Sequence, residues 1–106
     1  MALIQLKEGS QNTIFVIAVI KTTPNQPDLV RTIGWTVDVN DAIRFVRENV
    51  GGMSENGYYD LAVVEELGEG IYNHALQQFW FMWNEKKGYL PIIKPDRYKI
   101  FGRVTM

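Results

Sequence analysis

Residues 38–52 read DVNDAIRFVRENVGG, the clearest pattern of a single structural element in this sequence. Its apolar residues recur at helical spacing, while polar and charged residues occupy most of the remaining positions. The apolar face consists of Val39, Ala42, Ile43, Val46 and Val50. Asp38 can cap the first turn by accepting backbone N–H bonds. Gly51 and Gly52 predict the end of the helix, because glycine enters the left-handed conformation at little cost.

Two strands are predicted before this helix. Residues 13–21 contain an unbroken apolar run, which is typical of a strand covered on both faces and therefore central in a sheet. Pro24 and Pro27 then indicate a loop, since proline supplies no backbone donor. Residues 29–37 alternate and predict a second strand, antiparallel to the first because the connection is short. The residues expected on one of its faces are Ile33, Trp35 and Val37.

Three further strands are predicted after the helix. Residues 58–67 are apolar on both faces and indicate another central strand. Residues 78–84 form an aromatic strand, and residues 85–88 form a hairpin turn. Residues 89–94 return along the sheet, and Pro91 either marks that strand as an edge or interrupts it.

The predicted order is therefore β-β-α-β-β-β in a single α+β domain covering residues 1–106. About five strands form a largely antiparallel sheet, with the amphipathic helix on one face. Residues 1–10 are either a loose arm or an edge strand, and residues 100–104 can add a short strand. The face that the helix leaves open must be solvated, close by curling of the sheet, or meet a partner subunit.

Composition excludes several classes of function. The chain contains no cysteine, which excludes disulfides, thiolate nucleophiles and Cys-ligated zinc and favours a reducing compartment. The net charge is −1, without a basic stripe, so nucleic-acid binding is not expected. The longest apolar run is Ile14–Ile20, far below the ~20 residues needed to cross a bilayer, and the N-terminus lacks the pattern of a signal peptide. A cytoplasmic protein without membrane contact is expected.

Four segments carry a resemblance to a known family. They are Thr32-Ile33-Gly34-Trp35, the helix start Asp38-Val39-Asn40-Asp41-Ala42-Ile43, the strand from Tyr58 to Glu66, and Gly70-Ile71-Tyr72. With these segments, residues 13–83 resemble a family of small uncharacterised bacterial α+β proteins. The resemblance implies the same architecture, and it implies neither an activity nor a catalytic residue.

Candidate chemistry is sparse. His74 is the single histidine, and an acidic turn nearby supplies carboxylates that could orient it as a general base. A ligand pocket at this turn would use Glu66, Glu69, Tyr72 and His74. Asp60, Glu65 and Glu66 are better interpreted as a solvated strand end than as a catalytic carboxylate set. No metal site, cofactor or catalytic residue is predicted, and the sequence favours a protein that is not an enzyme.

The aromatic run at residues 79–83 is the most unusual feature of the chain. Alternation would place Trp80 on one face of its strand and Trp83 on the other. Both faces can pack in the core, or one can form an apolar surface for a partner or ligand. The leading hypothesis is a non-enzymatic interaction module that self-associates, as a homodimer, through Trp80 or Trp83. The alternatives are the pocket near the acidic turn and a nucleic-acid accessory protein that uses the basic residues between Lys86 and Arg103.

Overall fold

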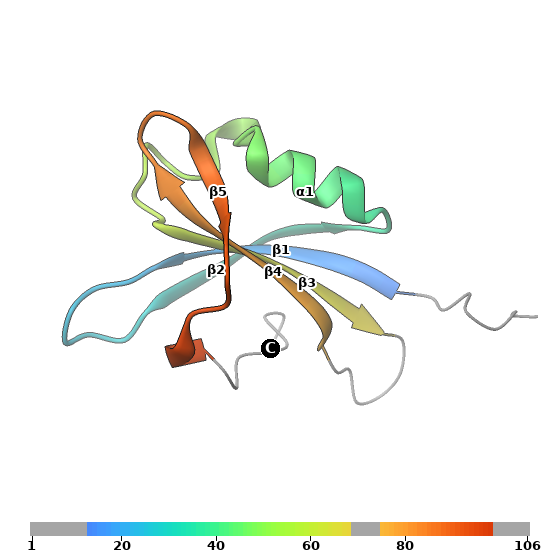
Figure 1. Cartoon of the computed structure of the whole chain (residues 1–106), viewed down its shortest axis with the longest axis horizontal. Helices are drawn as coiled ribbons and strands as arrows, with labels where there is room; N and C mark the ends of the chain where they lie inside the picture. The colour runs from blue at the N-terminus through green and yellow to red at the C-terminus, as the bar shows by residue number, and fades with distance from the viewer. Residues whose placement is uncertain (1–12, 69–74, 99–106) are drawn as a thin grey trace, which may run out of the picture.

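The computed structural model describes residues 13–68 and 75–98. Within these residues the chain forms five strands, one α-helix and two short 3-10 helices (Figure 1). In chain order they are β1 (Thr13–Lys21), β2 (Leu29–Thr36), α1 (Val39–Arg47), η1 (Val50–Gly52), β3 (Leu61–Gly68), β4 (Ala75–Asn84), β5 (Gly88–Ile92) and η2 (Asp96–Tyr98). The predicted α+β class, with an antiparallel sheet and one helix, is confirmed for this part of the chain.

The strands form one sheet in the order β2-β1-β3-β4-β5, and every neighbouring pair is antiparallel. β2 and β3 both flank β1, so they run parallel to each other. The chain must therefore cross over β1 between β2 and β3, and a crossover of this kind is usually a helix. α1 lies in that crossover and packs on one side of the sheet (Figure 1).

α1 begins as predicted and ends earlier than predicted. The Asp38 carboxylate accepts hydrogen bonds from the backbone N–H groups of Asn40 and Asp41, so the predicted N-cap is confirmed. The prediction that the helix continues to Val50 is wrong. Asn49 adopts a left-handed conformation with φ of 49°, and the Val50 side chain is 40% exposed. Asparagine tolerates this conformation better than most residues, so it ends the helix before the glycines do.

A β-bulge in β2 changes the faces of its side chains. Ile17 of β1 pairs with Gly34, and the next residue, Ala18, pairs with Thr32, so Ile33 is the extra residue. Ile33 packs against the core on the helix side of the sheet, whereas Trp35 pairs with Val16 on the other side. The prediction that Ile33 and Trp35 share a face is therefore wrong, because it assumed uninterrupted alternation.

Both faces of the sheet contribute to a core. The helix-side core is built from alternate residues of β1, β3 and β4 together with Ala42 and Val46 of α1. The opposite core contains the other alternate residues, and there Tyr98 of η2 stacks on Trp80 with ring centroids 5.0 Å apart. The Tyr98 hydroxyl also donates a hydrogen bond to Asp28, which ties η2 to the loop before β2. The face opposite α1 is therefore largely buried, and the central position predicted for β1 and β3 is confirmed.

The connections also differ in part from expectation. β3 begins at Leu61 and not at residue 58, because the Asp60 carboxylate accepts hydrogen bonds from the backbone N–H and the hydroxyl of Thr22 and holds this segment as a loop. The predicted turn between β4 and β5 is confirmed, and the Asn84 side chain accepts bonds from two of its backbone N–H groups. β5 is an edge among the described strands, as Pro91 predicts. The expectations for residues 1–10 and 100–104 lie outside the described residues.

Candidate functional site

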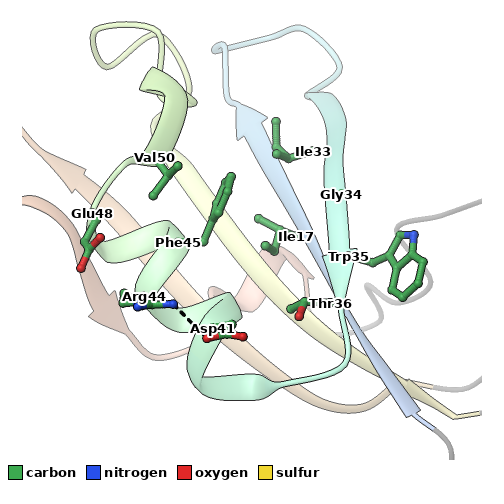
Figure 2. Close-up of a pocket in the computed structure, with 10 residues that line it drawn as sticks. All are labelled: Ile17, Ile33, Gly34, Trp35, Thr36, Asp41, Arg44, Phe45, Glu48 and Val50. Atoms are coloured by element: carbon green, nitrogen blue, oxygen red, sulfur yellow. Dashed lines mark hydrogen bonds and ion pairs between the residues drawn. The ribbon is translucent and has the colours of Figure 1, made fainter.

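A single helix cannot cover this sheet. An α-helix with its side chains is about 10–12 Å wide, whereas five strands at about 4.8 Å spacing span roughly 19 Å between the outer strands. α1 lies over the middle of the sheet, so a groove remains on each side of it. One groove lies between α1 and the edge strand β2 and is called here the α1–β2 groove (Figure 2).

The α1–β2 groove is apolar at its base and has a volume of about 530 Å³. Figure 2 shows Ile17, Ile33 and Phe45 between the helix and the strand. Gly34 widens the groove at this point: a Cβ atom added there would meet no heavy atom within 4 Å. Volumes of roughly 300–1,000 Å³ are typical of binding pockets. The groove is therefore large enough to take a side chain or a small ligand.

Charged side chains follow the helix along the rim of this groove. Asp41, Arg44 and Glu48 are spaced by three and four residues and therefore follow one side of α1 (Figure 2). Arg44 and Asp41 form an ion pair at 2.9 Å, and both side chains are more than half exposed. Exposed pairs of this kind contribute little to stability, about 0–1 kcal/mol. Arg44 and Asp41 balance each other, and Glu48 contributes the remaining negative charge.

The far wall of the groove is the edge strand itself. No other described strand pairs with the outer side of β2. Large apolar residues are exposed on and next to this strand: Leu29, Val30, Trp35 and Val37. The Trp35 side chain is 65% exposed and points away from α1, on the face of the sheet opposite the helix (Figure 2). Apolar surface on both faces of an edge strand is a feature of interaction sites.

An ion pair links β2 to the loop that follows η1. Arg31 of β2 and Glu55 of the loop lie 2.8 Å apart. A hydrogen bond with the Tyr59 hydroxyl and then the Glu55 carboxylate raise the pKa of Arg31 above its ordinary value. The pair joins the edge strand to the segment between α1 and β3.

The second groove lies on the other side of α1, against β4 and β5, and has a volume of about 600 Å³. Its walls are Val39, Asn40 and Ile43 of α1, residues 78–81 of β4, and Pro91, Ile92, Ile93 and Lys94. Pro91 has no N–H group, so β5 is a poor edge for a further strand. This groove lacks the row of charges, and its edge strand contains a proline, so the α1–β2 groove is the better candidate site.

The two tryptophans that the sequence indicated pack inside the protein. Trp80 is 3% exposed, and its indole N–H donates to the Gln78 side chain at 3.1 Å. Trp83 is partly buried and packs edge-on against the Tyr89 ring, with centroids 5.1 Å apart. This arrangement agrees with the alternative of two-sided core packing. In the structure, the exposed indole belongs to Trp35.

The acidic candidates are separated by the fold. Glu65 is fully buried and accepts a hydrogen bond from the Gln78 side chain at 2.8 Å, so the interpretation of Glu65 as part of a solvated strand end is wrong. Glu66 is partly buried on β3, where it pairs with Phe15. Asp60 binds Thr22. The structure therefore assembles no set of carboxylates from these three residues.

The other residues proposed for the acidic turn, Glu69, Tyr72 and His74, lie outside the described residues. In the part of the chain that is described, no group of three or more His, Asp or Glu side chains is placed to hold a metal ion. None of the helices in that part has the length and apolar character needed to span a bilayer.

Sequence reasoning missed the residues that form the α1–β2 groove, of which Gly34, Phe45 and Glu48 are the most informative. One signal was present: a glycine inside a strand pattern often marks a bulge or a close approach of another group. Phe45 also departs from the simple apolar stripe of the helix, because it lies beside that stripe and not within it.

Comparisons with known protein families, with curated proteins and with solved structures found no match to this chain. The resemblance to a family of small bacterial proteins therefore stays a prediction, and the function must be argued from the geometry alone.

Proposed function

We propose that this protein is a non-enzymatic interaction module that binds an extended segment of another polypeptide along β2, with apolar side chains of that segment in the α1–β2 groove. The observation that carries the proposal is the groove itself, an apolar cavity of about 530 Å³ directly beside an edge strand. Strand addition at a sheet edge is a common form of peptide recognition, in which backbone hydrogen bonds give affinity and pockets for alternate side chains give specificity.

The segment Gly34–Thr36 is the best place for such pairing. It lies beyond the bulge, so its pairing with β1 is regular, and it lines the groove. An added strand there would lie between the groove and the exposed Trp35 ring, and tryptophan is among the residues that most often dominate binding energy. The bulge interrupts regular pairing of an added strand with the rest of β2. A short bound segment is therefore favoured over a long added strand that would join the sheets of two proteins.

Gly34→Val tests the proposal. The added side chain fills open space, because a Cβ atom at Gly34 has no neighbour within 4 Å. Glycine in a strand costs about 0.5–1 kcal/mol relative to alanine, so we expect the variant to be at least as stable as the natural chain. It should nevertheless lose binding, because valine occupies the groove.

The experiment selects peptides of eight residues, the length of β2, from an unbiased display library against the full chain, and then measures their affinities by fluorescence polarisation. Gly34→Val is expected to weaken binding at least about tenfold, which corresponds to about 1.4 kcal/mol. Asn40→Leu is the matched control, because it adds bulk to the second groove on the other side of α1. Failure to select any peptide, or loss of binding in Asn40→Leu alone, would contradict the proposal.

Self-association, which the sequence predicts through Trp80 or Trp83, is the second candidate function, and here it would use the exposed surface of β2 instead. It draws support from Trp35, which is exposed on the edge strand where a second copy could reach it. Sedimentation over a range of concentrations separates the two cases. A monomer at all concentrations supports a foreign partner, whereas a dimer that Gly34→Val dissociates would show that a second copy occupies the groove.

A further inference from the structure

The charge on the rim of the α1–β2 groove indicates the chemistry of the partner, provided that the groove binds a peptide as proposed above. Of its three charged residues, Asp41 and Arg44 neutralise each other in an ion pair. Glu48 is exposed, and its carboxylate has no ion pair with any residue in the described ranges 13–68 and 75–98. The rim therefore carries one uncompensated negative charge, at the end of the groove where α1 stops.

The C-terminal end of α1 adds to the negative potential at Glu48. Glu48 is the C-cap of α1, and its backbone N–H donates to the carbonyl groups of Arg44 and Val46. The C-terminal end of a helix carries a partial negative charge, so a carboxylate there is unfavourable and a cation is stabilised by about 0.3–1 kcal/mol. Arg47 follows the usual preference for basic residues in the last turn, and Glu48 departs from it. A residue that goes against such a charge preference, without a contact that compensates for it, is expected most often at a functional site.

We infer that the partner is an extended peptide that presents apolar side chains at alternate positions to the groove and an arginine or lysine to Glu48. The apolar positions fit the base formed by Ile17, Ile33 and Phe45. The cationic side chain would meet both the Glu48 carboxylate and the carbonyl end of α1. Arginine is favoured over lysine, because its planar guanidinium binds a carboxylate through two parallel hydrogen bonds.

Two peptide libraries test this inference. Both carry apolar residues at alternate positions and differ at one terminal position, which is arginine in one library and glutamate in the other. Both are selected against the full chain. We expect arginine peptides to bind about three- to tenfold more tightly than the same peptides with glutamate, in the range of an ion pair assisted by a helix end.

Glu48→Lys should reverse the preference, so that glutamate peptides bind more tightly. The variant is expected to fold, because the side chain is exposed and a cation suits the end of the helix. Glu85→Lys is the matched control: it makes the same charge change on the exposed turn between β4 and β5, and it should leave the preference for arginine unchanged.

The outcomes separate this inference from the proposed function. A preference for arginine that Glu48→Lys reverses and Glu85→Lys preserves supports both. Binding without a preference, or with a preference that Glu48→Lys leaves intact, overturns the cationic partner but not the peptide-binding module. Absence of binding from both libraries overturns the two together.

Discussion

At the scale of single residues, Tyr89 shows how the helix-side core controls a titratable group. Its side chain is fully buried, and its hydroxyl donates to the backbone carbonyl of Tyr59 at 2.7 Å. Burial, and then the charges of Asp60 and Tyr59, raise the pKa of Tyr89 well above its ordinary value of 10.0. The hydroxyl therefore keeps its proton in the folded protein under conditions in which an exposed tyrosine would lose it.

Because of this raised pKa, the contribution of Tyr89 to the free energy of unfolding should depend on pH. In the unfolded chain Tyr89 loses its proton above about pH 10, whereas in the folded chain it retains the proton to higher pH. The folded state then binds more protons, so the contribution of Tyr89 to stability is present below about pH 10 and decreases as the pH rises further.

Tyr89→Phe is the corresponding variant. At about pH 7 it should lower the free energy of unfolding by about 1 kcal/mol, because the Tyr59 carbonyl loses its hydrogen bond. At about pH 11 the difference from the natural protein should become smaller, because phenylalanine does not titrate. Urea unfolding of both proteins at the two pH values measures this change. If the two proteins differ in free energy of unfolding by the same amount at both pH values, the pKa of Tyr89 is not raised in the folded protein.

At the scale of elements, α1 sets the geometry of the candidate site, because its position over β1 leaves the groove beside β2. The helix has only nine residues, a length that is marginal for an isolated helix, so the cap and the packed face must stabilise it. Asp38 accepts two backbone hydrogen bonds at the start of the first turn. The cap therefore contributes both to stability and to the place where the helix begins.

Asp38→Ala should lower the free energy of unfolding by about 1 kcal/mol, within the usual range for loss of an N-cap. Asp38→Asn should cost much less, because the asparagine side chain also accepts bonds from backbone N–H groups. Thermal unfolding monitored by circular dichroism compares the two variants. Equal losses in both would indicate that the charge of Asp38, and not its capping bonds, stabilises the helix.

The elements themselves were predictable because each is a local pattern. The apolar run at residues 13–21 and the helical spacing from Val39 to Val46 both appear as elements in the structure. The bulge at Ile33 was not predictable, since it depends on how β2 pairs with β1. The burial of Glu65 was missed for a similar reason: the partner Gln78 comes from another strand, and a charged residue near a strand end suggests solvent.

The candidate site was still less predictable. Gly34, Phe45 and Glu48 come from two elements, and they line one groove only because the crossover places α1 beside β2. The aromatic strand drew attention in the sequence because it is rich in tryptophan. The fold buries Trp80 instead, where Tyr98 stacks on it.

At the scale of the whole molecule, the two edges of the described sheet differ. β5 is short, at five residues, and contains Pro91, both of which discourage pairing with another chain. β2 is longer, contains no proline, and exposes apolar residues. Proteins generally protect the edges of their sheets, so an edge that no other described strand covers, beside an apolar groove, supports the proposal of a partner. This asymmetry adds support to the proposed function, which rests on the groove beside β2.

The most direct measurement is a map of the amide and indole N–H signals of the full chain by NMR, recorded while a selected peptide is added. If the peptide binds along β2, the largest shifts should occur at Gly34–Thr36, at Phe45 and at the exposed Trp35 indole, with little change at Trp80 in the core. Shifts centred on Phe79 and Ile92 would instead place the peptide in the second groove and rule out binding along β2.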